Sequence, residues 1–463
     1  MAGFFSTIFK KRMGTSRQVR LMIFQKENVE TNLDKRLLLI MLADILYGVY
    51  AMNTASQLNN IASIILLVVL ITLPPDKDIY VYAALIPFYT FVPQGSSIRL
   101  FFFFIISLIK IFWKNGTEVE RRYALCFFVW FGLEIVLDLF YAPGFDFTII
   151  LLMLYFVAYM IKCRNIDWEM GNNLMLIMIV SFSVVIIATA LSSETSLTYY
   201  LQTTNAQARF GEDARSLGGA MDLPIYCSVA LAVILCTFIS KRHVGFFQKI
   251  LCISLMCLCI VFGSLTVSRS FILAIVIIAI WTYISLIKDN KHRNKIIPIT
   301  LLALIVAFVL VWNSKEAILN ILNKYSQRDF FASSRSNIYS DCFDYLFTHP
   351  LNLFFGTGAF GYHYYGIVNN LSFRMFAHNL ILDAIMSWGI IGTIAMFSML
   401  CSYYRALKRE YGKPEMICFL PLAAWGAIMM TGGTFNYVEP YLYLLILIKM
   451  TFSFKLLGDK NNG

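Results

Sequence analysis

Apolar runs of about 16 to 22 residues recur along the whole chain, and each is long enough to cross a hydrocarbon core of about 30 Å as a helix. Of the 463 residues, 59% are hydrophobic and only 14% are charged, whereas soluble domains usually carry about 25% charged residues. The runs lack the short alternating pattern that is typical of barrel strands. The sequence therefore predicts an all-α, polytopic membrane bundle.

We predict about fourteen spans from these runs. Their approximate bounds are residues 37–54, 57–73, 79–93, 98–113, 123–141, 145–161, 173–191, 223–240, 246–264, 270–287, 296–313, 378–401, 415–431 and 438–454. Lysine and arginine gather in alternate connectors, which marks those connectors as cytoplasmic. On this reading residues 1–36 form a cytoplasmic segment without a cleavable signal peptide, and residues 456–463 form a cytoplasmic tail.

Two predicted outer loops are much longer than the other connectors. One spans residues 192–222 within the bundle of residues 37–313, and the other spans residues 314–377, before the C-terminal helices of residues 378–455. Loops of this length usually carry function. The second loop is rich in aromatic residues and predicts a helix from Ser334 to Thr348, followed by a turn at the glycines of residues 356–358. The residues expected on one side of that helix are Ile338, Cys342, Tyr345 and Leu346. We expect this loop to form an extracytoplasmic helical cap.

Candidate chemical groups lie near the predicted outer ends of the spans. His378 and Asn379 stand at the mouth of one span, and Arg215, Arg269 and Arg335 stand near other helix ends on the same side. A titratable imidazole beside several guanidinium groups at the lipid–water boundary suits chemistry on a lipid-linked phosphate. Further possible contacts are Arg209, Arg374 and Asp222.

Four local patterns resemble the O-antigen ligase/polymerase superfamily over roughly residues 190–405. They are Arg215 to Asp222 with its glycine pair, Thr266-Val267-Ser268-Arg269, Arg335 followed by Phe355-Gly356-Thr357-Gly358, and His378-Asn379 ahead of Gly389-Ile390-Ile391-Gly392. The resemblance implies a metal-independent glycosyltransferase without a cofactor, acting on undecaprenyl-diphosphate-linked glycans at the periplasmic face of the bacterial inner membrane. Two positions depart from the family: Ser387 replaces a frequent acidic residue, and Leu223-Pro224-Ile225 replaces the usual continuation after Asp222.

A mechanism follows from the chemistry of a departing lipid diphosphate. We expect Arg215, Arg269 and Arg335 to hold the diphosphate, because guanidinium groups stay charged and engage phosphate oxygens bidentately. No paired carboxylates or His/Cys cluster on the outer face suggest a metal site in the sequence. His378 is the expected general base for the acceptor hydroxyl, and direct displacement would invert the anomeric centre.

The preferred function is polymerisation of lipid-linked oligosaccharide repeats into O-antigen or capsule. The expected partners are the lipid-linked donor and acceptor, membrane lipids, a chain-length regulator and a repeat-unit flippase, and no nucleic acid despite the net charge of +11. The alternatives are a ligase that transfers the glycan to lipid A core, and a flippase or proton-coupled transporter. Glu134 and Asp138, one turn apart in a span, fit either proton movement or polar contacts between helices. Tyr362 and its neighbours are candidates for stacking on sugar rings.

Overall fold

The computed structural model consists of helices and short connectors, with no strand among the residues it describes. The described residues are 35–53, 56–91, 97–113, 121–141, 147–193, 195, 197–203, 209–210, 219–240, 246–288, 319–320, 322–324, 334–359, 361–432 and 439–462. The all-helical fold class is therefore confirmed for this part of the chain.

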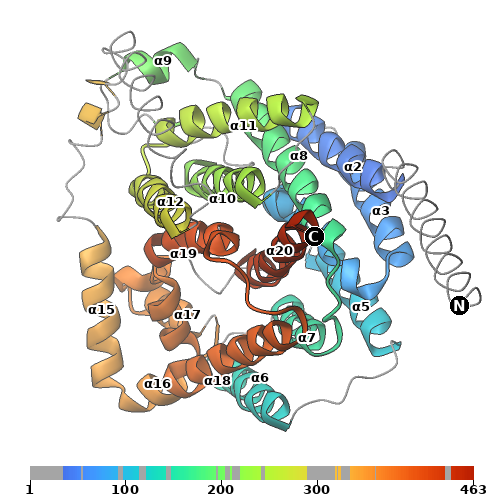
Figure 1. Ribbon diagram of the computed structural model, residues 1–463. Helices are drawn as coiled ribbons and strands as arrows, with labels where there is room; N and C mark the ends of the chain where they lie inside the picture. Colours follow the sequence, from blue (N-terminus) through green and yellow to red (C-terminus); the bar gives the residue numbers. More distant parts are fainter. Residues whose placement is uncertain are drawn as a thin grey trace, which may run out of the picture. The chain divides into compact units, whose positions relative to one another are not determined.

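The helices follow the predicted apolar runs closely (Figure 1). Their bounds are α2 Lys35–Asn53, α3 Ser56–Thr72, η1 Pro75–Lys77, α4 Ile79–Leu85, η2 Ile86–Phe91, α5 Ser97–Trp113, α6 Arg121–Tyr141, α7 Phe147–Lys162, α8 Trp168–Ser192, α9 Leu197–Gln202, α10 Gly219–Ser240, α11 Phe246–Leu265, α12 Arg269–Lys288, α15 Ser334–Thr348, α16 Pro350–Phe355, α17 Gly361–Val368, η4 Ser372–Met375, α18 Leu380–Tyr411, η5 Met416–Phe419, α19 Leu420–Gly432 and α20 Glu439–Asn462. The predicted span at residues 296–313 lies outside the described residues. Helix α20 continues to Asn462, through most of the stretch predicted to be a tail.

Within the described part of the chain, five helices are long and apolar enough to cross a membrane by length and composition. They are Trp168–Ser192, Asp222–Ile239, Arg269–Ile287, Leu380–Tyr411 and Glu439–Leu457. The chain is thus a multi-pass membrane protein, while the number of about fourteen spans stays a prediction. Several shorter apolar helices, including Leu125–Leu137 in α6, lie among the predicted spans.

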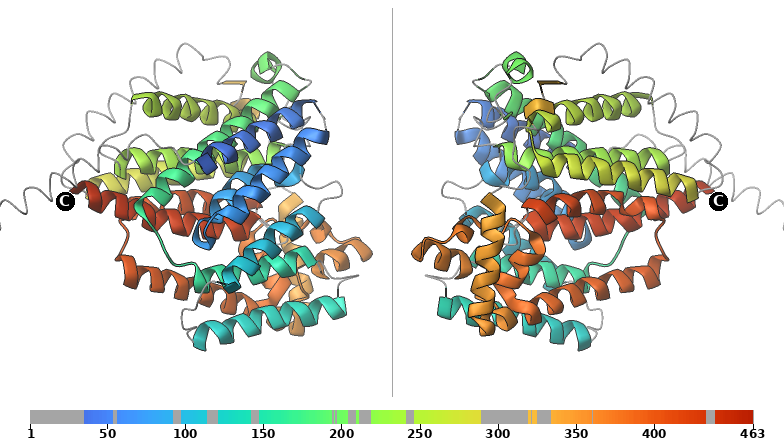
Figure 2. Two further views of the ribbon diagram at one scale, coloured as in Figure 1. Left: turned by 90° about the vertical axis from the view of Figure 1, so that its right-hand side faces the viewer. Right: turned by 90° about the vertical axis from the view of Figure 1, so that its left-hand side faces the viewer.

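The predicted helix of the second outer loop appears with the expected bounds, as α15. The four residues expected on one side, Ile338, Cys342, Tyr345 and Leu346, are all buried and belong to one hydrophobic cluster with parts of α17, η4 and α18. Burial of this face is what holds α15 on the rest of the chain, because the hydrophobic effect scales with apolar area removed from water. In Figure 2, α15 stands upright, whereas α6 and α18 run across the view.

Candidate functional site at one end of the helices

Several predicted cytoplasmic connectors meet at one end of the helices. Lys77 forms an ion pair with Asp167 at 3.4 Å, and the backbone N–H of Ile166 donates to the Tyr411 hydroxyl at 3.0 Å. The Lys449 ammonium donates to the Asn165 carbonyl at 2.8 Å. These contacts place the connectors before α4 and α8 beside the C-terminal end of α18, as the alternating charge pattern predicts. The compartment that this end faces stays a prediction.

At the opposite end, Arg209 is held against the turn that leads into Arg269. Its Nε donates to the Thr266 carbonyl at 3.0 Å, and the next residue, Phe210, donates its backbone N–H to the Leu265 carbonyl at 3.0 Å. Arg269 then begins α12. The first outer loop and the Thr-Val-Ser-Arg pattern, which are far apart in sequence, therefore meet, as their shared predicted sidedness requires.

The His378–Asn379 mouth lies at the same end as Arg269. Trp281, in the second half of α12, donates to the Met416 carbonyl at the start of η5 at 2.8 Å, so α12 and the η5–α19 segment run in opposite directions. Arg269 consequently lies beside the C-terminal end of α19. Asn379 donates through Nδ2 to the Met430 carbonyl near that end, at 2.9 Å. The loop that carries His378 and the start of α12 thus lie toward the same end of α19.

Asn379 caps α18, and the two residues around Ala377 have strained backbones. The Asn379 Oδ1 accepts hydrogen bonds from the N–H groups of Ile381 and Leu382, both at 3.1 Å, which satisfies two free donors at the helix start. His378 has a φ of +51° and Phe376 a φ of +68°. Residues other than glycine adopt such angles at a cost of about 1–3 kcal/mol and do so preferentially at functional sites.

Backbone strain is concentrated in the predicted motifs. Among the described non-glycine residues, only Val267, Asn370, Phe376 and His378 have positive φ. Val267 precedes Ser268 and Arg269, and its φ of +50° is unusual for a β-branched residue. Three of the four strained residues therefore fall in the Thr266–Arg269 and Phe376–Asn379 patterns, which is independent support for a site at this end.

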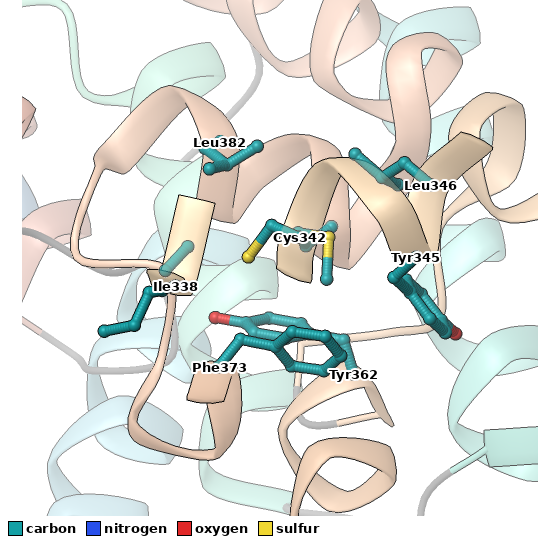
Figure 3. Close-up of a cluster of buried hydrophobic side chains, with 9 residues drawn as sticks. Ile338, Cys342, Tyr345, Leu346, Tyr362, Phe373 and Leu382 are labelled. Atoms are coloured by element: carbon teal, nitrogen blue, oxygen red, sulfur yellow. The ribbon is translucent and has the colours of Figure 1, made fainter. Parts of the chain in front are cut away.

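Two buried residues, Tyr362 and Asp383, hold the loop that carries His378. The Tyr362 hydroxyl donates to the Asp383 carboxylate and also hydrogen-bonds the Ala377 backbone. Burial, followed by the charge of Asp383, raises the pKa of Tyr362 well above its usual value, so the phenol stays protonated and remains a donor. Tyr362 lies in the same hydrophobic cluster as Phe373 and Cys342 (Figure 3). The expectation that Tyr362 stacks on a sugar is wrong, because its ring is fully buried.

The Gly356–Ala359 segment forms the predicted turn and is held by α18 and α6. The N–H groups of Thr357 and Gly358 donate to the Ser387 carbonyl at 3.0 and 2.8 Å. The Ala359 N–H donates to Glu134 at 3.0 Å, and the Trp388 indole donates to the other oxygen of Glu134 at 2.6 Å. Glu134 therefore serves polar contacts between helices, one of the two readings of its sequence position. The Asp138 side chain lies outside the described residues.

Two carboxyl groups meet at the site end, which the sequence did not predict. Asp222 is in the first turn of α10, Glu439 is in the first turn of α20, and the two lie close enough for their charges to interact. Sequence reasoning missed the pair because 216 residues separate the two positions. No third His, Cys, Asp or Glu joins them within the described part of the chain.

The remaining predicted residues are placed only in part. Arg335 lies in the first turn of α15 and Arg374 in η4, and both side chains fall outside the described residues, as does the whole of Arg215. The backbone still brings two motifs together, since Ile338, one turn after Arg335, and Ala377, directly before His378, share one buried cluster. Convergence of the arginines on His378 stays a prediction.

Comparison with protein families identifies the region that carries these motifs. The family described as O-antigen ligase matches residues 252–397, from α11 into α18. The matched region contains Arg269, Arg335, Arg374, His378 and Asn379. No curated protein and no solved structure matches the chain. The resemblance seen in the sequence is confirmed for this region, because residues 252–397 are similar to the O-antigen ligase family.

Proposed function

We propose that this protein is a membrane glycosyltransferase that joins undecaprenyl-diphosphate-linked oligosaccharide repeats into a surface polysaccharide and releases undecaprenyl diphosphate. The main support is the strained His378–Asn379 mouth, which lies at the same helix end as Arg269 and inside the region that matches the family. The proposed setting is the bacterial inner membrane, with the site on the periplasmic face.

The arginines neutralise the charge that develops on the leaving diphosphate. Arg215, Arg269 and Arg335 hold its oxygens, because a guanidinium offers paired donors and remains charged at any physiological pH. Arg209 uses its Nε to hold the turn that presents Arg269, so its contribution to the diphosphate is partly indirect. In a region where water is scarce, such fixed donors stabilise developing charge without a metal ion.

His378 removes the proton from the acceptor hydroxyl as that oxygen attacks the anomeric carbon. The bond to the diphosphate oxygen breaks in the same displacement, which inverts the anomeric centre. A positioned histidine contributes about 10²–10⁴-fold to such a step. The positive φ of His378 and the cap formed by Asn379 support this role, because they define the backbone conformation at the start of α18.

The test is elongation by purified, reconstituted protein in the presence of EDTA, with synthetic lipid-linked repeat units as donor and acceptor. We expect His378→Ala to reduce turnover by about 10²–10⁴-fold. His349→Ala is the matched control, because His349 lies at the α15–α16 junction, outside the His378–Asn379 pattern, and is exposed. Near-normal turnover by His378→Ala would remove the proposed base, and complete loss of activity in EDTA would show that a metal is required.

Ligase activity is the second candidate, favoured by the description of the matching family as O-antigen ligase. Polymerase and ligase share the donor and differ in the acceptor, which is a lipid-linked repeat in one case and lipid A core in the other. A cell lacking a polymerase accumulates single repeats, whereas a cell lacking a ligase accumulates long lipid-linked chains. Product analysis in a deletion strain therefore distinguishes the two functions.

A further inference from the structure

We propose that α15, α16 and the Gly356–Ala359 turn form a re-entrant element that lies within the depth of the bilayer, with its exposed apolar side chains against the lipid acyl chains. The sequence alone predicts that this segment belongs to an extracytoplasmic cap. The geometry relative to α6 and α18 favours the membrane instead, independently of the chemistry at His378.

The position of the turn along α18 gives one measure of its depth in the membrane. The candidate span begins at Leu380, and Ser387 and Gly389 follow seven and nine residues later. At 1.5 Å per residue, these positions lie about 10 to 14 Å along the helix from its start. The backbone of Gly356 approaches the Ser387 carbonyl so closely that a Cβ on this glycine would lie 2.2 Å from the oxygen. The turn after α16 is therefore level with the interior of α18.

The position of the turn along α6 gives a second, separate measure of this depth. It ends at Tyr141, and Glu134, which accepts the hydrogen bond from the Ala359 N–H, lies seven residues before that end. The corresponding depth is about 10 Å. Where these helix ends mark the edge of the hydrocarbon core, both distances place the turn about one third of the way into a core of about 30 Å.

The backbone of the turn is buried and hydrogen-bonded, as irregular backbone at this depth in a bilayer must be. Irregular backbone inside a bilayer is tolerated only where protein surrounds it and satisfies its polar groups. Residues Gly356 to Ala359 are all buried, and the N–H groups of Thr357, Gly358 and Ala359 all have acceptors on α18 or α6. The break in α18 at Gly389, with a φ of +62°, lies beside the same turn.

The outer surface of α15 and α16 carries large apolar side chains beside exposed polar ones, which include Asp344 and Thr348. Phe347 and Leu351 are each 72% exposed, and Phe343 and Phe354 are about half exposed. Helix α16 packs on α18, and the Tyr141 hydroxyl of α6 donates to Asn352 at 3.3 Å. The exposed apolar side chains of α15 and α16 are therefore next to those of two neighbouring spans. Those spans expose Phe140, Ile391 and Ile394.

The orientation of α15 is that of a helix lying in the membrane plane. Figure 2 shows α15 running crosswise to α6 and α18. Its buried face carries Cys342 and Leu346 toward the protein, and its outer face carries Phe343 and Phe347. Interfacial helices insert apolar faces about 5–10 Å into the boundary between headgroups and acyl chains, a depth similar to the distance of the Gly356–Ala359 turn from the ends of α6 and α18.

Cysteine labelling of the full-length protein in phosphatidylcholine vesicles tests the proposal. The parent carries serine at Cys257 and Cys401, the two exposed cysteines. Phe347→Cys and Leu351→Cys are each labelled with a membrane-impermeant maleimide, before and after detergent. Asn369→Cys, at an exposed polar turn after α17, measures the labelling of a water-facing thiol and the fraction of outward-facing molecules. Cys342 is an internal negative control, because its side chain is fully buried.

We expect Phe347→Cys and Leu351→Cys to react on the order of 10-fold more slowly than Asn369→Cys in intact vesicles and to recover in detergent, because the thiolate is suppressed in apolar surroundings. A bimane label attached at the same two positions should be quenched by brominated acyl chains. Equal labelling rates in intact vesicles would overturn the proposal. Slow labelling without quenching would also overturn it, because another protein segment, rather than lipid, would then cover this surface.

Discussion

Replacing Gly389 with alanine tests the contact between α16 and the break in α18. The φ of +62° and ψ of −175° at Gly389 fall in a region that is essentially restricted to glycine. A Cβ atom at this position would lie 2.3 Å from the carbonyl carbon and oxygen of Phe354 and 2.4 Å from the nitrogen of Phe355. All three are backbone atoms, so either α16 or α18 must move to accommodate the alanine.

Gly412→Ala is the matched control for the backbone term. Gly412 has a φ of +80° and a ψ of 177°, but a Cβ there would meet only the end of the Lys455 side chain, at 3.1 Å. Gly412→Ala should therefore cost only the strain of about 1–3 kcal/mol. Gly389→Ala should cost the same strain and a further penalty of about 1–3 kcal/mol for displacing packed backbone. Gly426→Ala, in α19 with open space around it, should stabilise the helix by about 0.5–1 kcal/mol.

The assay is thermal unfolding of the purified full-length protein in detergent, followed by tryptophan fluorescence. The expected order of stability is Gly426→Ala, then the parent, then Gly412→Ala, then Gly389→Ala. Because Gly389 and Gly412 share nearly the same dihedral angles, their difference isolates the close approach of Phe354. Equal destabilisation by the two substitutions would refute the packing of α16 against the interior of α18.

Two further substitutions test the buried polar contacts, again by thermal unfolding. Glu134→Gln replaces an acceptor with an amide donor opposite either the Ala359 N–H or the Trp388 indole, and we expect a loss of about 1–3 kcal/mol from the unsatisfied groups; no loss would mean that these groups find other acceptors. Tyr362→Phe leaves Asp383 and the Ala377 amide without their shared partner and should cost about 1–3 kcal/mol, whereas Tyr364→Phe, at an exposed position, should stay within about 0.5 kcal/mol of the parent.

Periodicity and charge predicted the local structure because both are properties of consecutive residues. The helix from Ser334 to Thr348 was predicted with its bounds, and its buried side from four apolar positions spaced by three or four residues. The turn at Gly356 and Gly358 followed from glycine chemistry, and both have positive φ in the structure.

Contacts between distant segments could not be predicted in this way. Nothing near Glu134 indicates that its acceptors serve Ala359 and Trp388, which follow it by more than 220 residues. The approach of Asp222 to Glu439 depends on how α10 packs against α20. The sequence did carry one usable signal, since a carboxylate within an apolar span requires polar partners or a function.

The support beneath His378 links the proposed chemistry to the membrane position of the second loop. Tyr362 in α17 holds the Ala377 amide and Asp383, and so holds both sides of the strained His378 backbone. The same α17 begins two residues after Ala359, whose amide is fixed on Glu134 about 10 Å into α6. A displacement of the re-entrant turn would therefore reach the imidazole through one short helix. Because strain at His378 persists only while its surroundings enforce it, loosening the turn should release the loop even when His378 itself is unchanged.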